Sequence, residues 1–145
     1  MRANFRLRFL ASCVALIAGL TSLPSYADAP SALLEQGDQQ WAAGKLELAQ
    51  KAFEQAVVNA PRSVGAHMKL AGLQLYRQDF KACIETYQRT IGLDANNAKA
   101  WMGLGFAYLH TGKNDLSLAA FNESIRVEPG NKEKLASVLA KLGAP

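Results

Sequence analysis

The sequence predicts an all-α protein built from three similar helix pairs. Large aromatic residues recur at a constant interval of 34 residues, at Phe53, Tyr87 and Phe121. Two further markers follow the same interval, namely the small residues Gly37, Ala71 and Gly105 and the turn residues Pro61, Ala95 and Pro129. Three markers that share one period indicate an internal repeat. No window alternates apolar and polar residues as a half-buried strand would.

The first helix pair is expected within residues 30–63. Ser31 is expected to cap a helix that runs from about Ala32 to Ala43, and Gly44 then breaks this helix. A second helix ends at Pro61. Its apolar residues recur at helical spacing, at Leu46, Ala49, Phe53 and Ala56.

The second helix pair is expected within residues 64–97. Ser63 is placed to cap its first helix, and the polar turn at residues 77–79 leads into its second helix. Apolar residues again follow helical spacing in both helices. They are Leu70, Ala71, Leu73, Leu75, Cys83, Ile84, Tyr87 and Ile91.

The third helix pair, within residues 98–131, has the clearest pattern. Asn97 caps its first helix and Gly112 ends it, and Asn114 opens a second helix that stops before Pro129. One face of the first of these helices carries Trp101, Leu104, Gly105 and Tyr108. We expect Trp101 to fill the densest slot between the helices.

The pattern of residues 132–145 predicts a seventh helix, which covers the last helix pair. Its apolar stripe is formed by Leu135, Val138, Leu139 and Leu142. Its other side carries Lys132, Lys134 and Lys141, and Gly143 ends it. Because a helix pair cannot bury its apolar face alone, we expect this stripe to pack on the third pair as a cap.

The N-terminus has the pattern of a signal peptide. It begins with three arginines, Arg2, Arg6 and Arg8. The apolar or small residues from Phe9 to Leu20 follow, and Pro24 stops any helix before cleavage sites after Ala27 or Ala29. This run of 12 residues is shorter than the roughly 18 to 20 that a membrane-spanning helix needs. We therefore expect residues 1–27 to be removed and the protein to be periplasmic or secreted, with a retained membrane anchor as the alternative.

Removal of this leader changes the charge of the chain. The whole chain has 16 basic and 12 acidic residues, and three arginines leave with residues 1–27, so the net charge falls from +4 to +1. The basic character therefore belongs largely to the leader, and nucleic acid is not an expected partner. Once Cys13 is removed, Cys83 has no partner for an intramolecular disulfide.

The third helix pair resembles a tetratricopeptide repeat. It matches the motif W-x-x-L-G-x-x-Y, with the later turn, aromatic and proline positions, through Trp101, Leu104, Gly105, Tyr108, Gly112, Phe121 and Pro129. The second unit has His67 in place of tryptophan, and Leu33 and Gln40 replace both aromatics of the first unit. The resemblance implies three helix-turn-helix units (30–63, 64–97 and 98–131) stacked as a right-handed solenoid, followed by a capping helix at 132–145.

The residues that often carry chemistry do not form a recognisable site. His67 and His110 lie on different helices with no other metal ligands at suitable spacing, so we expect a packing role and a helix-end role. Cys83 takes a small packing position and is expected to be an inert, buried thiol. Gly103 and Gly105 lack the preceding strand of a dinucleotide-binding fingerprint. The sequence thus predicts no enzyme, no metal site and no cofactor.

The resemblance implies that the first helix of each unit lines a concave groove for peptides or partner helices. On the fifth predicted helix, Met102, Phe106 and Leu109 form a second apolar stripe, interrupted only by Lys99 and His110. A helix that is apolar on all sides is either fully buried or awaits a partner. We expect the groove to be lined by Leu34, Asp38, Trp41, Met68, Lys69, Leu75, Lys99, Met102, Phe106 and Leu109.

The predicted groove differs from grooves in the family that grip an acidic C-terminus. Those grooves use Lys, Asn and Arg at positions that here hold Leu34, Asp38 and Gly103. Methionine and aromatic side chains instead suit an apolar or amphipathic segment. Phe106 stands where asparagine is common in the family, so we expect Phe106→Asn to affect binding while leaving stability nearly unchanged.

These features favour a non-catalytic scaffold of the bacterial envelope that binds another protein or peptide as an assembly or maturation factor. One alternative is an accessory subunit for a small apolar ligand or lipid, for which a closed pocket of about 300 Å³ or more would be evidence. Another alternative is self-association, with the groove filled by a second copy. After cleavage of the leader, no membrane-spanning segment is expected.

Overall fold

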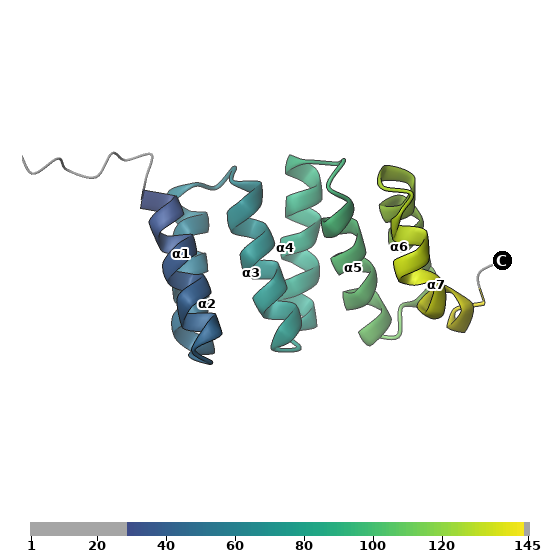
Figure 1. Cartoon of the computed structure of the whole chain (residues 1–145), viewed down its shortest axis with the longest axis horizontal. Coiled ribbons are helices and arrows are strands. Elements are labelled where there is room, and N and C mark those ends of the chain that lie inside the picture. Colours follow the sequence, from purple (N-terminus) through teal and green to yellow (C-terminus); the bar gives the residue numbers. More distant parts are fainter. Residues whose placement is uncertain (1–28, 144–145) are drawn as a thin grey trace, which may run out of the picture.

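The computed structural model describes residues 29–143, which form seven α-helices arranged as a row of antiparallel pairs (Figure 1). The helices are α1 (Ala29–Ala42), α2 (Leu46–Asn59), α3 (Val64–Tyr76), α4 (Phe80–Leu93), α5 (Ala98–His110), α6 (Asn114–Val127) and α7 (Asn131–Lys141). The first helices α1, α3 and α5 form one layer, and the second helices lie behind them (Figure 1). The predicted fold of three helix pairs and a seventh, capping helix is confirmed. The predicted leader, residues 1–27, lies outside the described residues.

Two of the predicted helix caps are present. The Ser63 hydroxyl accepts a hydrogen bond from the backbone N–H of Ala66 at 3.2 Å, which satisfies a donor at the start of α3. The Asn97 side chain accepts one from Ala100 at 3.0 Å at the start of α5. These caps fix where the first helices of the second and third pairs begin.

The start of the first helix differs from the prediction. Because α1 begins at Ala29, Ser31 lies inside the helix and is not its cap. Pro30 fits the first turn, where a backbone N–H has no partner within the helix and the fixed backbone angle of proline suits helical geometry. The predicted start near Ala32 was therefore too late.

Two buried phenylalanines press directly onto glycines of the first helices. Phe53 of α2 and Phe121 of α6 are fully buried. A Cβ atom added at Gly105 would lie 2.5 Å from ring carbons of Phe121, and one added at Gly37 would overlap Phe53 in the same way. The absence of a side chain at these two positions therefore lets each helix pair close.

In the middle helix pair, the first helix has alanine and not glycine at this contact. Ala71 stands at the position that is glycine in the other two pairs, and the Tyr87 ring belongs to the same core cluster as Ala71. That ring also lies against Gly103 of α5, where an added Cβ atom would overlap it. Gly103, which we expected at a groove position, is thus a buried packing position between the second and third pairs.

Trp101 does not fill the densest slot of the core, contrary to the prediction. Its side chain is half-buried, and its indole N–H donates a hydrogen bond to the backbone oxygen of Ala95 at 2.9 Å. At the corresponding place in α3, His67 is fully buried and its Nε2 lies 3.0 Å from the backbone oxygen of Pro61. A carbonyl oxygen only accepts, so this nitrogen carries the proton. His67 therefore replaces tryptophan by bonding the equivalent carbonyl at the end of the preceding unit, and the predicted packing role is confirmed.

The capping helix α7 is held to α6 by one buried leucine and a short polar network. Leu135 is fully buried, as is Asn131. The Asn131 amide donates to the Ser124 hydroxyl at 2.9 Å, and this hydroxyl donates to the backbone oxygen of Ala98 at 2.8 Å. Lys134 donates to the Asn131 side-chain oxygen at 2.8 Å. These contacts fix the start of α7, whereas its later apolar residues are less covered.

Candidate binding groove

Residues at equivalent positions of the three units form three rows across the layer of first helices. Since α1, α3 and α5 lie side by side, each row crosses this layer (Figure 1). The rows are Leu34–Met68–Met102, Asp38–Gly72–Phe106 and Trp41–Leu75–Leu109. We call these rows, together with Lys69 and Lys99, the groove face. It contains all ten residues that the sequence placed in the groove.

The apolar side chains of the groove face are half-buried. Leu34 and Trp41 pack against a core cluster that contains Phe53 and Leu73. Met68 and Leu75 pack against the neighbouring cluster around Tyr87. The floor of the groove face is therefore continuous with the core, and one side of these side chains still reaches solvent.

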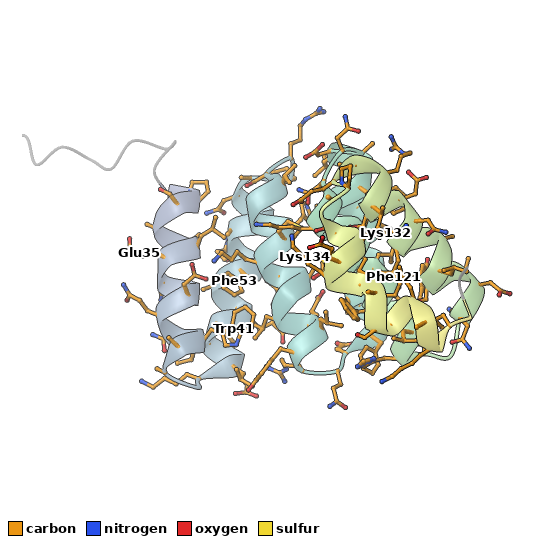
Figure 2. All side chains as sticks on the ribbon, turned by 45° about the vertical axis from the view of Figure 1, so that its right-hand side comes forward. Glu35, Trp41, Phe53, Phe121, Lys132 and Lys134 are labelled. Carbon is orange, nitrogen blue, oxygen red and sulfur yellow. The ribbon has the colours of Figure 1, made fainter. Side chains whose placement is uncertain are left out.

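An aromatic pair lies at one end of the third row. The Trp41 ring meets the Phe53 ring edge-on, with 6.3 Å between centroids (Figure 2). Its centroid also lies 5.9 Å from that of the Tyr76 ring. Tyr76 is 65% exposed, so it offers a large aromatic surface beside Trp41. The sequence prediction missed Tyr76. Its place directly after Leu75, at the position equivalent to His110 in the next unit, is the signal that would have identified it.

Phe106 contributes to packing as well as to the groove face. Its ring meets the Phe121 ring edge-on, with 5.0 Å between centroids and 72° between ring planes. Such aromatic pairs add about 0.5 to 1.5 kcal/mol beyond the buried area. We therefore revise the expectation for Phe106→Asn, because this change removes a packing contact and lowers stability by a measurable amount.

The two opposite charges of the groove face form an ion pair. Lys69 Nζ lies 2.8 Å from each carboxylate oxygen of Asp38, and the two side chains are 45% and 44% exposed. The pair links α3 to α1. Each charge largely cancels the field of the other, so this part of the groove face attracts neither a cation nor an anion strongly.

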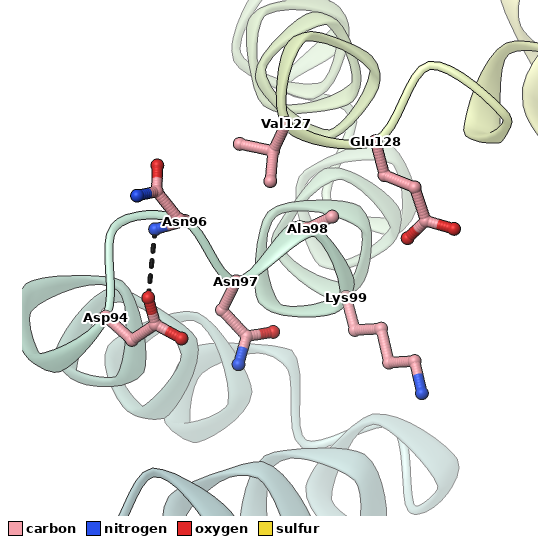
Figure 3. A pocket seen from close by; sticks show the side chains of 7 residues that line it. All are labelled: Asp94, Asn96, Asn97, Ala98, Lys99, Val127 and Glu128. Atoms are coloured by element: carbon pink, nitrogen blue, oxygen red, sulfur yellow. Dashed lines mark hydrogen bonds between the residues drawn. The ribbon is translucent and has the colours of Figure 1, made fainter.

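A shallow hollow of about 410 Å³ lies beside Lys99, between the α4–α5 turn and the end of α6 (Figure 3). Its lining residues are Asp94, Asn96, Asn97, Ala98, Lys99, Val127 and Glu128. Asp94 accepts a hydrogen bond from the backbone N–H of Asn96 at 3.1 Å. The hollow is open to solvent and lined mostly by polar residues, so it does not provide the closed apolar pocket that a small apolar ligand or lipid requires.

The two remaining candidate residues are His110, the exposed last residue of α5 at its predicted helix-end position, and Cys83. His110 lies edge-on to Phe80, with 5.0 Å between the ring centroids. Cys83 is a free, buried cysteine, and burial raises the pKa of its thiol to about 12, with a further contribution from the charge of Asp79. The thiol is therefore protonated at neutral pH, and its reactivity is low.

Metal binding and membrane insertion each require a recognisable arrangement of side chains. Within residues 29–143, His, Cys, Asp and Glu side chains do not gather in threes in a way that could hold a metal ion. Over the same residues, none of the helices has the length and apolar character needed to cross a bilayer.

Comparison with known families gives a match to the tetratricopeptide repeat, over residues 34–82 and 69–132. Among curated proteins, the chain is similar to the peptidyl-prolyl cis-trans isomerase FKBP4 of Bos taurus, with 33% identity over 76 residues. That match covers 52% of this chain and 17% of the isomerase. Superkiller protein 3 of Saccharomyces cerevisiae is 32% identical over 57 residues, which are 39% of this chain and 4% of that protein. The chain thus spans less than a fifth of the length of these relatives.

Several solved structures share the fold. The first tetratricopeptide domain of Spaghetti (RPAP3), bound to the HSP90 peptide SRMEEVD, superposes with a TM-score of 0.75 at 18% identity, covering 80% of this chain and 91% of that one. The tetratricopeptide domain of Arabidopsis OM64 gives 0.74 at 19% identity, covering 80% and 98%. MamA gives 0.67 at 26% identity, covering 72% and 61%.

Proposed function

The chain belongs to the tetratricopeptide repeat family, and we propose that its groove face binds an apolar or amphipathic segment of another polypeptide. Peptide binding by a domain of this fold is seen in Spaghetti, which holds an HSP90 peptide. In the present chain, the proposal rests on the residues that cross the layer of first helices. We propose no catalytic residue, metal or cofactor for this function.

The observation that carries the proposal is the apolar character of the groove face at α5. Met102 and Leu109 are half-buried and belong to rows whose other members are also apolar. A methionine side chain adapts its shape to an apolar partner because it has three rotatable bonds and a polarisable sulfur. An amphipathic helix that enters such a groove makes contact through residues at helical spacing.

Charge supports an apolar segment over an acidic one. Asp38 and Lys69 neutralise each other, as their 2.8 Å contacts show. Leu34 and Asp38 stand where family members that bind an acidic C-terminus have Lys and Asn, so neither position supplies a group that binds a carboxylate. Lys99 is exposed and lines the same hollow as Asp94 and Glu128 (Figure 3).

The proposed setting is the bacterial envelope, where the protein acts as an assembly or maturation factor. This part of the proposal is supported by the N-terminal sequence, in which three arginines precede a short apolar run. We propose that residues 1–27 are removed, that the repeats occupy 30–63, 64–97 and 98–131, and that 132–145 form the cap. Intact-mass measurement of the protein from an envelope fraction tests this, because retention of Met1 would indicate an anchor instead.

Site-specific photo-crosslinking in living cells tests the binding surface. A photo-reactive amino acid replaces Met102 in one variant and Val58 in the other. Val58 is a matched control because it is apolar, lies on α2 in the opposite layer and is 71% exposed. We expect a defined protein adduct at position 102 and none at position 58. The same adducts at both positions, or adducts at position 58 alone, would show that the groove face is not the binding surface.

A further inference from the structure

The capping helix α7 leaves an apolar stripe incompletely covered. It has the register of a first helix, since Leu135, Val138 and Leu142 stand one repeat after Trp101, Leu104 and Tyr108 of α5. In α5, Leu104 and Tyr108 are 3% and 9% exposed. On α7 the residues Val138, Leu139 and Leu142 are only half-buried. In α5, Leu104 and Tyr108 lie in a core cluster with residues of the preceding unit and with Ala120 of the following helix α6, but within residues 29–143 no helix follows α7.

Lysines border this stripe on both sides. Lys132 lies two helical turns before Leu139, and Lys134 lies one turn before Val138, so each is beside an apolar residue of the stripe. Lys141 lies two turns after Lys134. The helix carries these three lysines and one acidic residue, Glu133, which gives it a net charge of +2. All three lysines are exposed, and Figure 2 shows Lys132 and Lys134 on this end of the molecule. Lys134 is paired with Glu128 at 3.4 Å, whereas Lys132 and Lys141 form no ion pair with another residue of 29–143.

The opposite end of the solenoid has the complementary charge. The helix α1 carries Glu35 and Asp38 and no basic residue, which gives it a net charge of −2. Asp38 is already paired with Lys69, whereas no cation among residues 29–143 forms an ion pair with Glu35. Glu35 is exposed and points away from the other helices at the end opposite to Lys132 (Figure 2).

The end surface beside Glu35 contains the positions that, in the third unit, pack against the preceding unit. Leu33, Gln36 and Gln40 occupy the positions that hold Trp101, Leu104 and Tyr108 in α5. In the third unit these side chains pack against the unit before it. In the first unit Leu33 and Gln40 are half-buried and Gln36 is exposed, so this surface is partly apolar and partly polar.

We propose that α7 of one copy docks on the α1 end surface of a second copy of this chain. The lysines of α7 then lie near Glu35, and the stripe of Val138, Leu139 and Leu142 is covered against Leu33. A symmetrical contact between two α7 helices is disfavoured because it brings two groups of lysines together. The proposed contact joins two different surfaces, so it continues from copy to copy and does not stop at a dimer. It leaves the groove face open, and it does not depend on the function proposed above.

Sedimentation of the purified protein tests this contact. At about 0.01 M salt, where charges act over about 30 Å, we expect the average mass to rise with concentration and to pass twice the monomer mass. At about 1 M salt, where the screening length is about 3 Å, we expect most of this rise to be lost. A monomer mass at every concentration in low salt would overturn the proposal, and so would an association that stops at the dimer.

Charge reversal identifies the surfaces. Glu35→Lys alone replaces the unpaired negative charge of α1 with a positive one, and Lys132→Glu with Lys141→Glu changes the net charge of α7 from +2 to −2. Either change should abolish the rise in mass, because like charges then meet in the contact. Lys134 is left unchanged because it bonds to Asn131 within the fold. An equal mixture of the two variants should regain the association, because each then meets an end of opposite sign. Thermal melting confirms that each variant folds. If folded Glu35→Lys protein still associates like the unmodified protein, or if the mixture does not associate, the proposed contact is wrong.

Discussion

The two apolar faces of α5 are shaped by different constraints. On the packed face, Gly105 touches the fully buried Phe121 of α6, and Leu104 is 3% exposed. On the groove face, Met102 and Leu109 are apolar but half-buried. Close packing explains why the first face must be apolar and why one position is glycine. It does not explain the second face, and this is why we propose that the groove face binds a partner.

The largest expected effect is a difference in stability between substitutions of two phenylalanines in contact, Phe121 in the core and Phe106 on the groove face. Phe121→Ala should lower the free energy of unfolding by about 3 to 5 kcal/mol, because a fully buried ring is lost. Phe106→Ala should cost about 1 kcal/mol, since Phe106 is half-buried and loses mainly its edge contact with Phe121. Urea unfolding of both variants measures the difference. Equal losses would mean that Phe106 belongs to the core and that the distinction between the faces fails.

The next effect concerns glycine on the packing face. Gly105→Ala should lower stability by about 1 to 3 kcal/mol, because the new methyl group meets the Phe121 ring at 2.5 Å in a filled core. Gly92→Ala in α4 is the matched control, because nothing lies within 4 Å of a Cβ atom there. Alanine is the better helix former, so Gly92→Ala should raise stability by about 0.5 to 1 kcal/mol. Thermal unfolding of both variants measures the two changes in stability. If both substitutions raised or both lowered stability, this account would be contradicted.

The smallest expected effect is that of the ion pair on the groove face. Asp38→Ala, Lys69→Ala and the double variant form a cycle that isolates the coupling between these side chains. Because both are nearly half exposed, we expect a coupling of only about 0.2 to 1 kcal/mol, which falls as salt is added. A coupling that is larger and insensitive to salt would show that this part of the groove face is a structural element and not an open surface.

Much of the fold follows from the sequence because its causes are local. The constant interval between equivalent residues shows the repeat, and short-range hydrogen bonds explain the caps at Ser63 and Asn97. The start of α1 was predicted too late because both Pro30 and Ser31 are typical of a helix start. In the structure the proline lies in the first turn, and the helix therefore begins before Ser31. The role of Trp101 was overestimated because a residue type does not show how far neighbouring turns cover it. His67 was predicted correctly because its slot is usually aromatic in the family.

The groove face was harder to predict, because its properties depend on contacts between units. The pairing of Lys69 with Asp38 joins residues 31 positions apart and is set by the spacing of α1 and α3. The contact of Tyr76 with Trp41 likewise depends on how α3 lies against α1. Gly103 shows the same limit, since it lies on a first helix but serves the packing of Tyr87.

The most direct test of the central claim is the affinity of the groove face for its partner segment. The segment crosslinked at position 102 is prepared as a synthetic peptide and titrated calorimetrically against the unmodified protein, Met102→Gln, Asp38→Ala and Lys99→Ala. We predict that Met102→Gln weakens binding at least tenfold, about 1.4 kcal/mol, while its melting temperature stays close to that of the unmodified protein. The two charge variants should change affinity much less. Loss of binding in Asp38→Ala or Lys99→Ala, with full affinity in Met102→Gln, would contradict the claim and show that recognition is polar.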